Sequence, residues 1–202
     1  MRSLSDERIT VIYNTYLSVI APFIIQLEVL DGEFPIEILN EVRAIFTHLA
    51  RCSVTDDSNV YEENIVKSER HVKRAVLDCF KYLCVAYDEH FRAFSRLNRN
   101  VDLSYVSNGE FLRKLNELHA EAVKNKTAAQ TKELRAENME DVFDDYEKAY
   151  NSYAAVYNCI QDSSESIDYF KHKAVAKDTL NIIFGAVGVV SLILTVVFQF
   201  LF

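Results

Sequence analysis

Apolar and polar side chains recur with a helical period along most of this chain. Between residues 61 and 98 the apolar positions follow steps of three and four, which is typical of one buried helix face: Val72, Val76, Phe80, Leu83, Tyr87, Phe91 and Phe94. The same pattern predicts helices at about 6–30, with a kink at Pro22, and at about 35–52. A fourth helix is expected to bury Leu112, Leu115, Leu118 and Ala122, and a last one to begin near Met139.

Residues that make turns are scarce. The 202 residues include only four Gly and two Pro, and neither type occurs between Gly109 and Gly185. Long helices and an all-α fold are therefore predicted. We expect a cytosolic helical head at 1–137, a long helix or stalk at 138–178 and a transmembrane helix at 179–202.

The pattern changes after Asp178, because no charged side chain follows it. Leu180–Phe202 comprises 23 residues, and a helix of that length crosses a hydrocarbon core of about 30 Å. Basic side chains that precede this segment favour the cytoplasmic side: Lys171, His172, Lys173 and Lys177. The sequence predicts a single-pass anchor in the inner (cell) membrane with residues 1–178 in the cytoplasm.

Small and polar residues lie on one side of this segment, within an arc of about 120° on a helical wheel. They are Asn181, Gly185, Gly188, Ser191, Thr195 and Gln199. Polar groups in lipid need partners and small residues let helices approach closely, so the segment is expected to self-associate. Two interpretations stay open: a dimer or small bundle, or a symmetric ring that lines a pore with this polar stripe.

A second seam precedes the membrane segment. Its members follow the three-four spacing of coiled coils: Phe143, Tyr146, Tyr150, Tyr153, Tyr157, Ile160 and Ile167. The seam fits a helix packed on its own domain, an intersubunit stalk joined rigidly to the membrane span, or a platform for stacking bases. A continuous rod would transmit movement of the head to the pore.

Charge is distributed unevenly. The formal net charge is −8, yet residues 67–99 contain eight Lys and Arg against four Asp and Glu. The candidate ligand-binding residues in this stretch are Lys67, Arg70, Arg74, Lys81, Arg92, Arg96 and Arg99. All but Lys67 fall on the side opposite Val72, which makes them either a solvated face or a surface that binds the phosphates of a nucleotide or short oligonucleotide. A membrane-surface role is less favoured, because these residues are far in sequence from the span.

Enzyme motifs are scarce. The sequence has no glycine-rich phosphate loop, no zinc-type Cys/His spacing and no nucleophile elbow, so we expect no enzyme activity, no cofactor and no metal. Four cysteines without short paired spacing are expected to stay reduced: Cys52, Cys79, Cys84 and Cys159.

One motif resembles a known superfamily. "EVRAIFTH" contains Arg43 and His48 as R-x4-H, and with the following "NIVKSERHVKRAVLDCFKYL" it is similar to HEPN proteins, whose ribonucleases use such a motif at a dimer interface. The resemblance implies that Arg43 would hold phosphate and His48 would act as acid and base. Ala44 stands where a polar residue is usual, and the pair is about 140° apart on a helix. We interpret this part as a HEPN-like scaffold used for binding.

The whole plan resembles membrane effectors of bacterial anti-phage nucleotide signalling, of which the Hailong-type channel effector is the nearest in plan. That resemblance implies a homo-oligomeric channel, with a tetramer favoured, whose cytosolic part binds a single-stranded DNA oligomer that holds it closed. It also implies a partner nucleotidyltransferase that makes the signal. Related effectors open on ligand binding. The competing classes are a membrane-anchored HEPN-type RNase and a tail-anchored adaptor without a pore.

Overall fold

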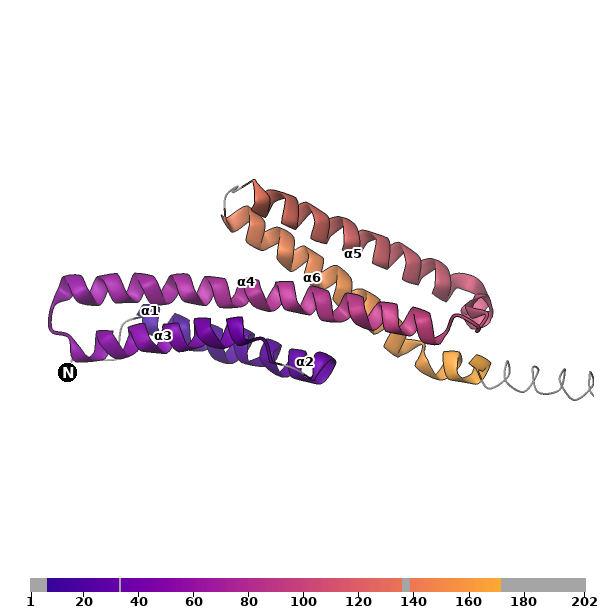
Figure 1. Ribbon diagram of the computed structural model, residues 1–202, viewed down its shortest axis with the longest axis horizontal. Coiled ribbons are helices and arrows are strands. Elements are labelled where there is room, and N and C mark those ends of the chain that lie inside the picture. Colours follow the sequence, from indigo (N-terminus) through magenta and orange to yellow (C-terminus); the bar gives the residue numbers. More distant parts are fainter. Residues whose placement is uncertain (1–6, 33, 136–138, 172–202) are drawn as a thin grey trace, which may run out of the picture. The chain divides into compact units, whose positions relative to one another are not determined.

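The computed structural model describes residues 7–32, 34–135 and 139–171, and its elements there are all helical (Figure 1). The all-α prediction is confirmed for this part of the chain. The elements are α1 (Glu7–Thr15), a π-helical turn (Tyr16–Ile20), α2 (Ala21–Asp31), α3 (Ile36–Val54), α4 (Ser58–Leu97), a 3-10 segment (Leu103–Gly109), α5 (Glu110–Leu134) and α6 (Met139–Asp162). The segment 179–202, with its six stripe residues, lies outside the described residues.

The kink expected at Pro22 takes the form of the π-helical turn just before it. Ala21 N–H bonds to the carbonyl of Tyr16, five residues back, where an α-helix would bond four back. Proline has no N–H and its ring crowds the carbonyl four residues earlier, so a wider turn relieves the strain. The helix ends at Gly32, whose φ of 70° is a left-handed conformation that glycine adopts at low cost.

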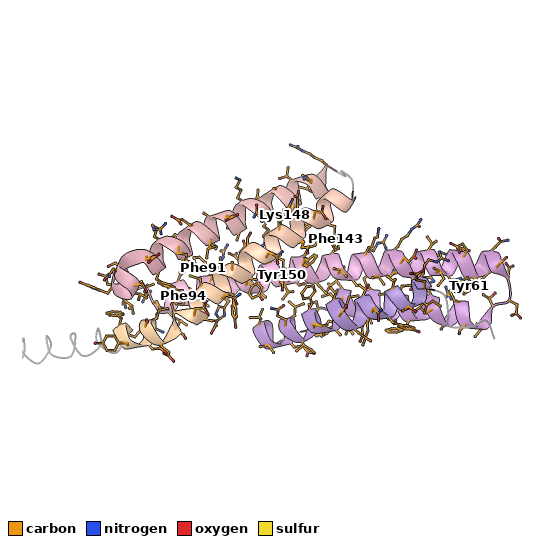
Figure 2. All side chains as sticks on the ribbon, turned by 180° about the vertical axis from the view of Figure 1, so that it is seen from behind. Tyr61, Phe91, Phe94, Phe143, Lys148 and Tyr150 are labelled. Carbon is orange, nitrogen blue, oxygen red and sulfur yellow. The ribbon has the colours of Figure 1, made fainter. Side chains whose placement is uncertain are left out.

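The chain divides into two compact units, Met1–Ala93 with Glu117–Tyr157, and Phe94–Asn116 with Asn158–Phe202. In the first unit, α4 is the helix that the others contact. α3 runs antiparallel to it, and α2 packs on it through Phe23, whose ring lies 5.5 Å from that of Phe80. α6 carries Phe143 and Tyr150 (Figure 2). Both rings pack on α4, with centroids 5.4 Å from that of Phe80.

This packing accounts for the aromatic seam of α6. Tyr146 and Tyr153 are 3% and 1% exposed, and the Tyr150 ring contacts Phe23, Phe80 and Tyr87 from its own chain. The seam is therefore packed on its own domain, the first of the three interpretations. Tyr146 and Tyr153 are therefore covered by their own chain and are not offered to a neighbouring subunit or to stacked bases.

The expected register of the fourth helix needs a correction. Its fully buried positions in α5 are Phe111, Leu115, Ala122 and Ala129, whereas Leu112 and Leu118 are only half-buried. The buried face thus begins one residue earlier and continues through the polar stretch 124–134. Small alanines let this stretch pack closely despite its hydrophilic neighbours.

The second unit has a core of its own, in which Val106, Phe111, Leu115, Ile160 and Ile167 are buried. α6 ends here at Asp162, and a turn at Ser163 precedes further helical residues 164–171. Ser163 N–H bonds three residues back, to the Ile160 carbonyl, which tightens the chain locally. The predicted continuous rod is therefore interrupted before the chain reaches residue 172.

One helical stretch in the described part is long and apolar enough to cross a membrane, and it lies near the N-terminus. Glu7–Leu30 has a mean hydropathy of 1.4, and 17% of it is buried. The sequence predicted the span at 179–202, not in this stretch. Ile9, Ile12, Ile20 and Leu27 are buried on its inner face, whereas Leu17, Ile25 and Val29 are exposed.

Candidate functional site

A polar seam joins α3 to α4. His48 Nδ1 lies 2.8 Å from Asn64 Oδ1, and His71 Nδ1 lies 2.6 Å from Glu41 Oε2. Between them the Ser68 hydroxyl donates to the carbonyl of Ile45 at 3.3 Å. We call Glu41, His48, Asn64 and His71 the histidine seam. Each pair takes one residue from each helix, so the antiparallel register of α3 and α4 assembles the seam.

The hydrogen bonds fix how the histidines are protonated when neutral. Asn64 Nδ2 donates to the Val60 carbonyl at 2.7 Å, which turns Oδ1 toward His48. An amide oxygen only accepts, so His48 Nδ1 carries the proton and Nε2 is left as the basic nitrogen. The carboxylate of Glu41 imposes the same arrangement on His71. The two rings stack with centroids 5.3 Å apart.

Arg43 takes no part in this seam. It is exposed on α3, and among the described residues its side chain makes no ion pair or hydrogen bond; its carbonyl accepts a hydrogen bond from the Thr47 hydroxyl at 2.8 Å. His48 instead faces α4 and is half-buried. The R-x4-H pair therefore does not meet within one chain. A second chain would have to supply an Arg43 for the motif to close.

Glu41, Asn64 and His71 were not predicted as site residues from the sequence. The spacing contained a signal, because Glu41 and His48 are seven residues apart on one helix, as are Asn64 and His71 on the next. Residues seven apart share a helix face. Only the pairing of α3 with α4 shows that the two faces meet.

Carboxylates gather farther along the α3–α4 contact. Burial raises the pKa of Asp78, and the nearby Glu41, Glu133 and Glu37 raise it further, against the opposing effect of Lys81. Burial also raises the pKa of Tyr82 to about 12, with help from its hydrogen bond to Glu37. The three neighbouring glutamates make this part of the contact unfavourable for an anionic ligand.

The candidate basic residues divide into two groups. Lys67, Lys81 and Arg92 are already paired with Glu63, Glu133 and Asp88, at 2.5, 2.5 and 2.9 Å. The other four are exposed and form no ion pair with the described residues: Arg70, Arg74, Arg96 and Arg99. Arg70 and Arg74 belong to the first unit, and Arg96 and Arg99 to the second. These four arginines are the ones whose charge is available to a ligand.

Arg92 has a structural role that the sequence did not indicate. The buried carboxylate of Asp88 accepts hydrogen bonds from Arg92 Nε at 3.0 Å and pairs with His119 Nε2 at 3.0 Å. Burial alone would raise the pKa of Asp88, but these bonds outweigh it and hold the pKa below its usual value. The His119 ring stacks on Phe91 with centroids 3.8 Å apart. The cluster links α4 to α5.

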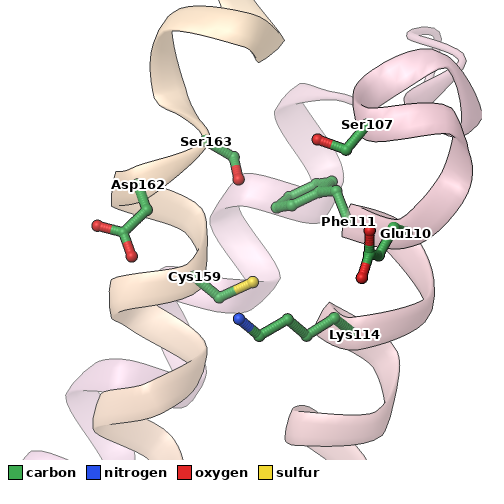
Figure 3. A pocket seen from close by; sticks show the side chains of 7 residues that line it. All are labelled: Ser107, Glu110, Phe111, Lys114, Cys159, Asp162 and Ser163. Atoms are coloured by element: carbon green, nitrogen blue, oxygen red, sulfur yellow. The ribbon is translucent and has the colours of Figure 1, made fainter.

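A small pocket of about 190 Å³ opens in the second unit (Figure 3). It is lined by Ser107, Glu110, Phe111, Lys114, Cys159, Asp162 and Ser163. Lys114 reaches across it toward Cys159. Ligand pockets usually measure about 300–1,000 Å³, and two carboxylates oppose one lysine here, so the pocket suits neither a nucleotide nor an oligonucleotide.

The cysteines are buried thiols, in line with the reduced state expected from their spacing. Burial raises the pKa of the Cys79 and Cys84 thiols to about 12, so thiolates do not form near neutral pH. Within the described ranges no cluster of three or more His, Cys, Asp or Glu side chains could hold a metal ion.

Comparisons with protein-family models, curated proteins and solved structures return no match to this chain. The function is therefore argued from its own residues.

Proposed function

We propose that the protein is a membrane effector, not an enzyme, which forms a homo-oligomeric pore gated by a nucleotide or oligonucleotide bound to its helical domain. The observation that carries the proposal is the one-sided polar stripe along the charge-free segment 180–202. A simple lipid anchor needs no polar side chains in the membrane, whereas a pore or helix bundle needs them on one face. A role in anti-phage defence, with a nucleotidyltransferase as the source of the ligand, follows from the resemblance in plan.

The ligand is proposed to bind through the available arginines. Arg70 and Arg74 are exposed, four residues apart on α4, and form no ion pair with the part of the chain that the structure describes. A guanidinium group binds phosphate oxygens in a bidentate manner, and α4 repeats such groups along an otherwise acidic protein. In an oligomer these groups are multiplied around one axis, which raises the local potential for an anion.

The exposed side of α3 supports association of several copies. Ile36, Leu39, Phe46 and Val54 are 66%, 48%, 39% and 83% exposed. With Arg43 and Ala50 between them, they follow steps of three and four, and of the four only Phe46 also makes ring contacts with described residues of its own chain, Tyr13 and Tyr16. α3 buries a second stripe, which includes Ile45 and Leu49, inside its own chain. A helix with two apolar stripes is typical of one that also packs on a neighbouring copy. A tetramer is the favoured assembly.

Ion flux in liposomes tests the pore. Reconstituted protein is expected to release a trapped cation or dissipate an imposed potential, with a rate that changes when short oligodeoxynucleotides or cyclic dinucleotides are added. Gly188→Leu should abolish flux, because Gly188 lies on the polar stripe, whereas Val189→Leu on the lipid side should retain it. Flux equal to that of empty liposomes, or a monomer by light scattering in mild detergent, would refute the pore and leave the adaptor or RNase classes.

A further inference from the structure

Three aromatic side chains cluster near residue 171, the last that the structure describes. The ring of Tyr105, from the 3-10 segment, stacks on that of Phe170 with centroids 6.1 Å apart, and Tyr169 meets Phe170 edge-on at 5.2 Å. Tyr105 and Tyr169 are nevertheless 64% and 62% exposed. We call Tyr105, Tyr169 and Phe170 the aromatic cluster. Its rings are ordered against one another while much of their apolar surface stays uncovered.

The cluster stands next to the apolar segment in sequence. Lys171 follows it directly, and the run without charges starts at Leu180, nine residues later. Even a fully extended chain of that length spans at most about 32 Å. Tyr105 is 65 residues from Phe170 in sequence, and only the fold brings the two rings together.

The chemistry of the cluster suits the boundary between lipid and water. Tyrosine has an apolar ring and a polar hydroxyl, and for that reason it is enriched where acyl chains meet headgroups. Asp168 is the acid nearest in sequence, and it is paired with Lys171 at 3.3 Å. Arg96 and Arg99, which belong to the same compact unit, form no ion pair with described residues and can meet lipid phosphates.

From these observations we infer that the aromatic cluster docks into the interfacial region of the lipid bilayer that the C-terminal segment enters. The inference rests on the proposed membrane span. It gives the second unit a function of its own, because the cluster would hold the end of the head against the lipid surface. Arg96 and Arg99, at the basic end of α4, would then lie at that surface and contact lipid. Their distance in sequence from the span had disfavoured such a role.

The chain contains no tryptophan, so single substitutions supply a unique fluorescent reporter. Tyr105→Trp and Tyr169→Trp report on the cluster. Leu134→Trp is the matched control, because Leu134 is 88% exposed in the first unit. Each full-length variant is reconstituted in phosphatidylcholine vesicles with and without bromine-labelled acyl chains. Flotation of the vesicles in a density gradient first shows whether the chain is held in the membrane.

Tryptophan at 105 and 169 is expected to emit at shorter wavelength than at 134 and to be quenched several-fold more strongly by the brominated lipid. Adding Tyr105→Glu to the Tyr169→Trp variant should reduce the quenching at 169, because a carboxylate opposes entry into lipid. Chains that float while all three reporters stay unquenched would overturn the docking and leave the membrane span intact. A blue shift at 105 and 169 without quenching would also overturn it, because it would indicate contact with protein. Chains that do not float would overturn both proposals.

Discussion

The imidazole rings of His48 and His71 stack with their centroids 5.3 Å apart and their planes inclined by 17°. Each ring is tied at Nδ1 to a side chain of the opposite helix, His48 to Asn64 and His71 to Glu41. Both imidazoles are thus committed to the contact between α3 and α4. This relationship explains why His48, the histidine of the R-x4-H motif, faces the interior of its own domain.

His48→Ala is expected to lower stability and leave function largely intact. The change removes the hydrogen bond to Asn64 and leaves a part-buried amide oxygen without its donor, which costs about 1–2 kcal/mol of the free energy of unfolding. Arg43→Ala, at an exposed position, should change that free energy by less than about 0.5 kcal/mol. Urea unfolding of both variants measures the difference. Loss of a measured RNA-cleaving activity in His48→Ala would contradict the structural role.

Asp78→Asn is expected to stabilise the protein at neutral pH. The pKa of Asp78 is raised above its ordinary value of 3.8 by burial and by neighbouring carboxylates, so the folded state disfavours its charge. The gain should be below about 1 kcal/mol, because solvent screens a partly exposed carboxylate. The stabilisation should be absent below about pH 3.8, where Asp78 is neutral in both the folded and the unfolded protein. It should grow as the pH rises from there through the raised pKa of the folded protein. A destabilised Asn variant at neutral pH would show that Asp78 is stabilised by its charge.

Asp88 should behave in the opposite sense. Its lowered folded pKa means that its ionised form stabilises the fold above the ordinary pKa and that this contribution is lost as the pH falls through the folded value. Asp88→Asn is expected to cost about 1.5–3 kcal/mol near neutral pH, because charge-assisted hydrogen bonds to Arg92 and His119 are lost. Thermal unfolding from pH 7 down to strongly acidic pH should show the variant and the parent converging. A constant difference across that range would disprove the electrostatic account.

Charge reversal separates the two groups of basic residues. Arg70→Glu and Arg74→Glu are expected to weaken oligonucleotide binding, and the parent's affinity should fall steeply as salt rises, because each phosphate contact releases counterions. Lys124→Glu, at an exposed position on α5, is the control and should bind nearly as the parent does. Calorimetric titration at two salt concentrations measures both effects. Equal affinity in all three variants would leave the arginines as an ordinary solvated surface.

A close contact between α5 and α6 gives a test of the packing. The bond from Asn125 to Ser152 at 2.9 Å and the bond from Tyr146 to Glu133 at 2.7 Å set an antiparallel register that places Ala129 opposite Ala149. Both alanines are 0% exposed. Ala129→Leu should therefore cost about 1–3 kcal/mol through overpacking. The neighbouring exposed change Ala128→Leu should be nearly neutral, and similar unfolding midpoints for the two variants would rule out the close contact.

The positions of the helices could be predicted from local sequence signals. A period of three and four, the scarcity of Gly and Pro, and the proline at position 35 predicted α3 and α4 to within a few residues, because these signals act within a single helix. Pro22 likewise located the irregularity before α2, although its π-helical form depends on how the flanking turns pack. The reduced state of the four cysteines was likewise expected from their spacing in the sequence alone.

Which helix faces meet depends on contacts between segments that are distant in the chain. Sequence periodicity shows that a helix has an apolar stripe but does not identify its partner, so the α6 seam suited a stalk as well as the domain interior until Phe23, Phe80 and Tyr87 were found against it. The same holds for charge. Lys81 and Arg70 look alike in the sequence, yet Lys81 is neutralised by Glu133, 52 residues away, because a long-range ion pair depends on helix register. Helix formation depends on local sequence, whereas partners and free charges are set by contacts between residues distant in the chain.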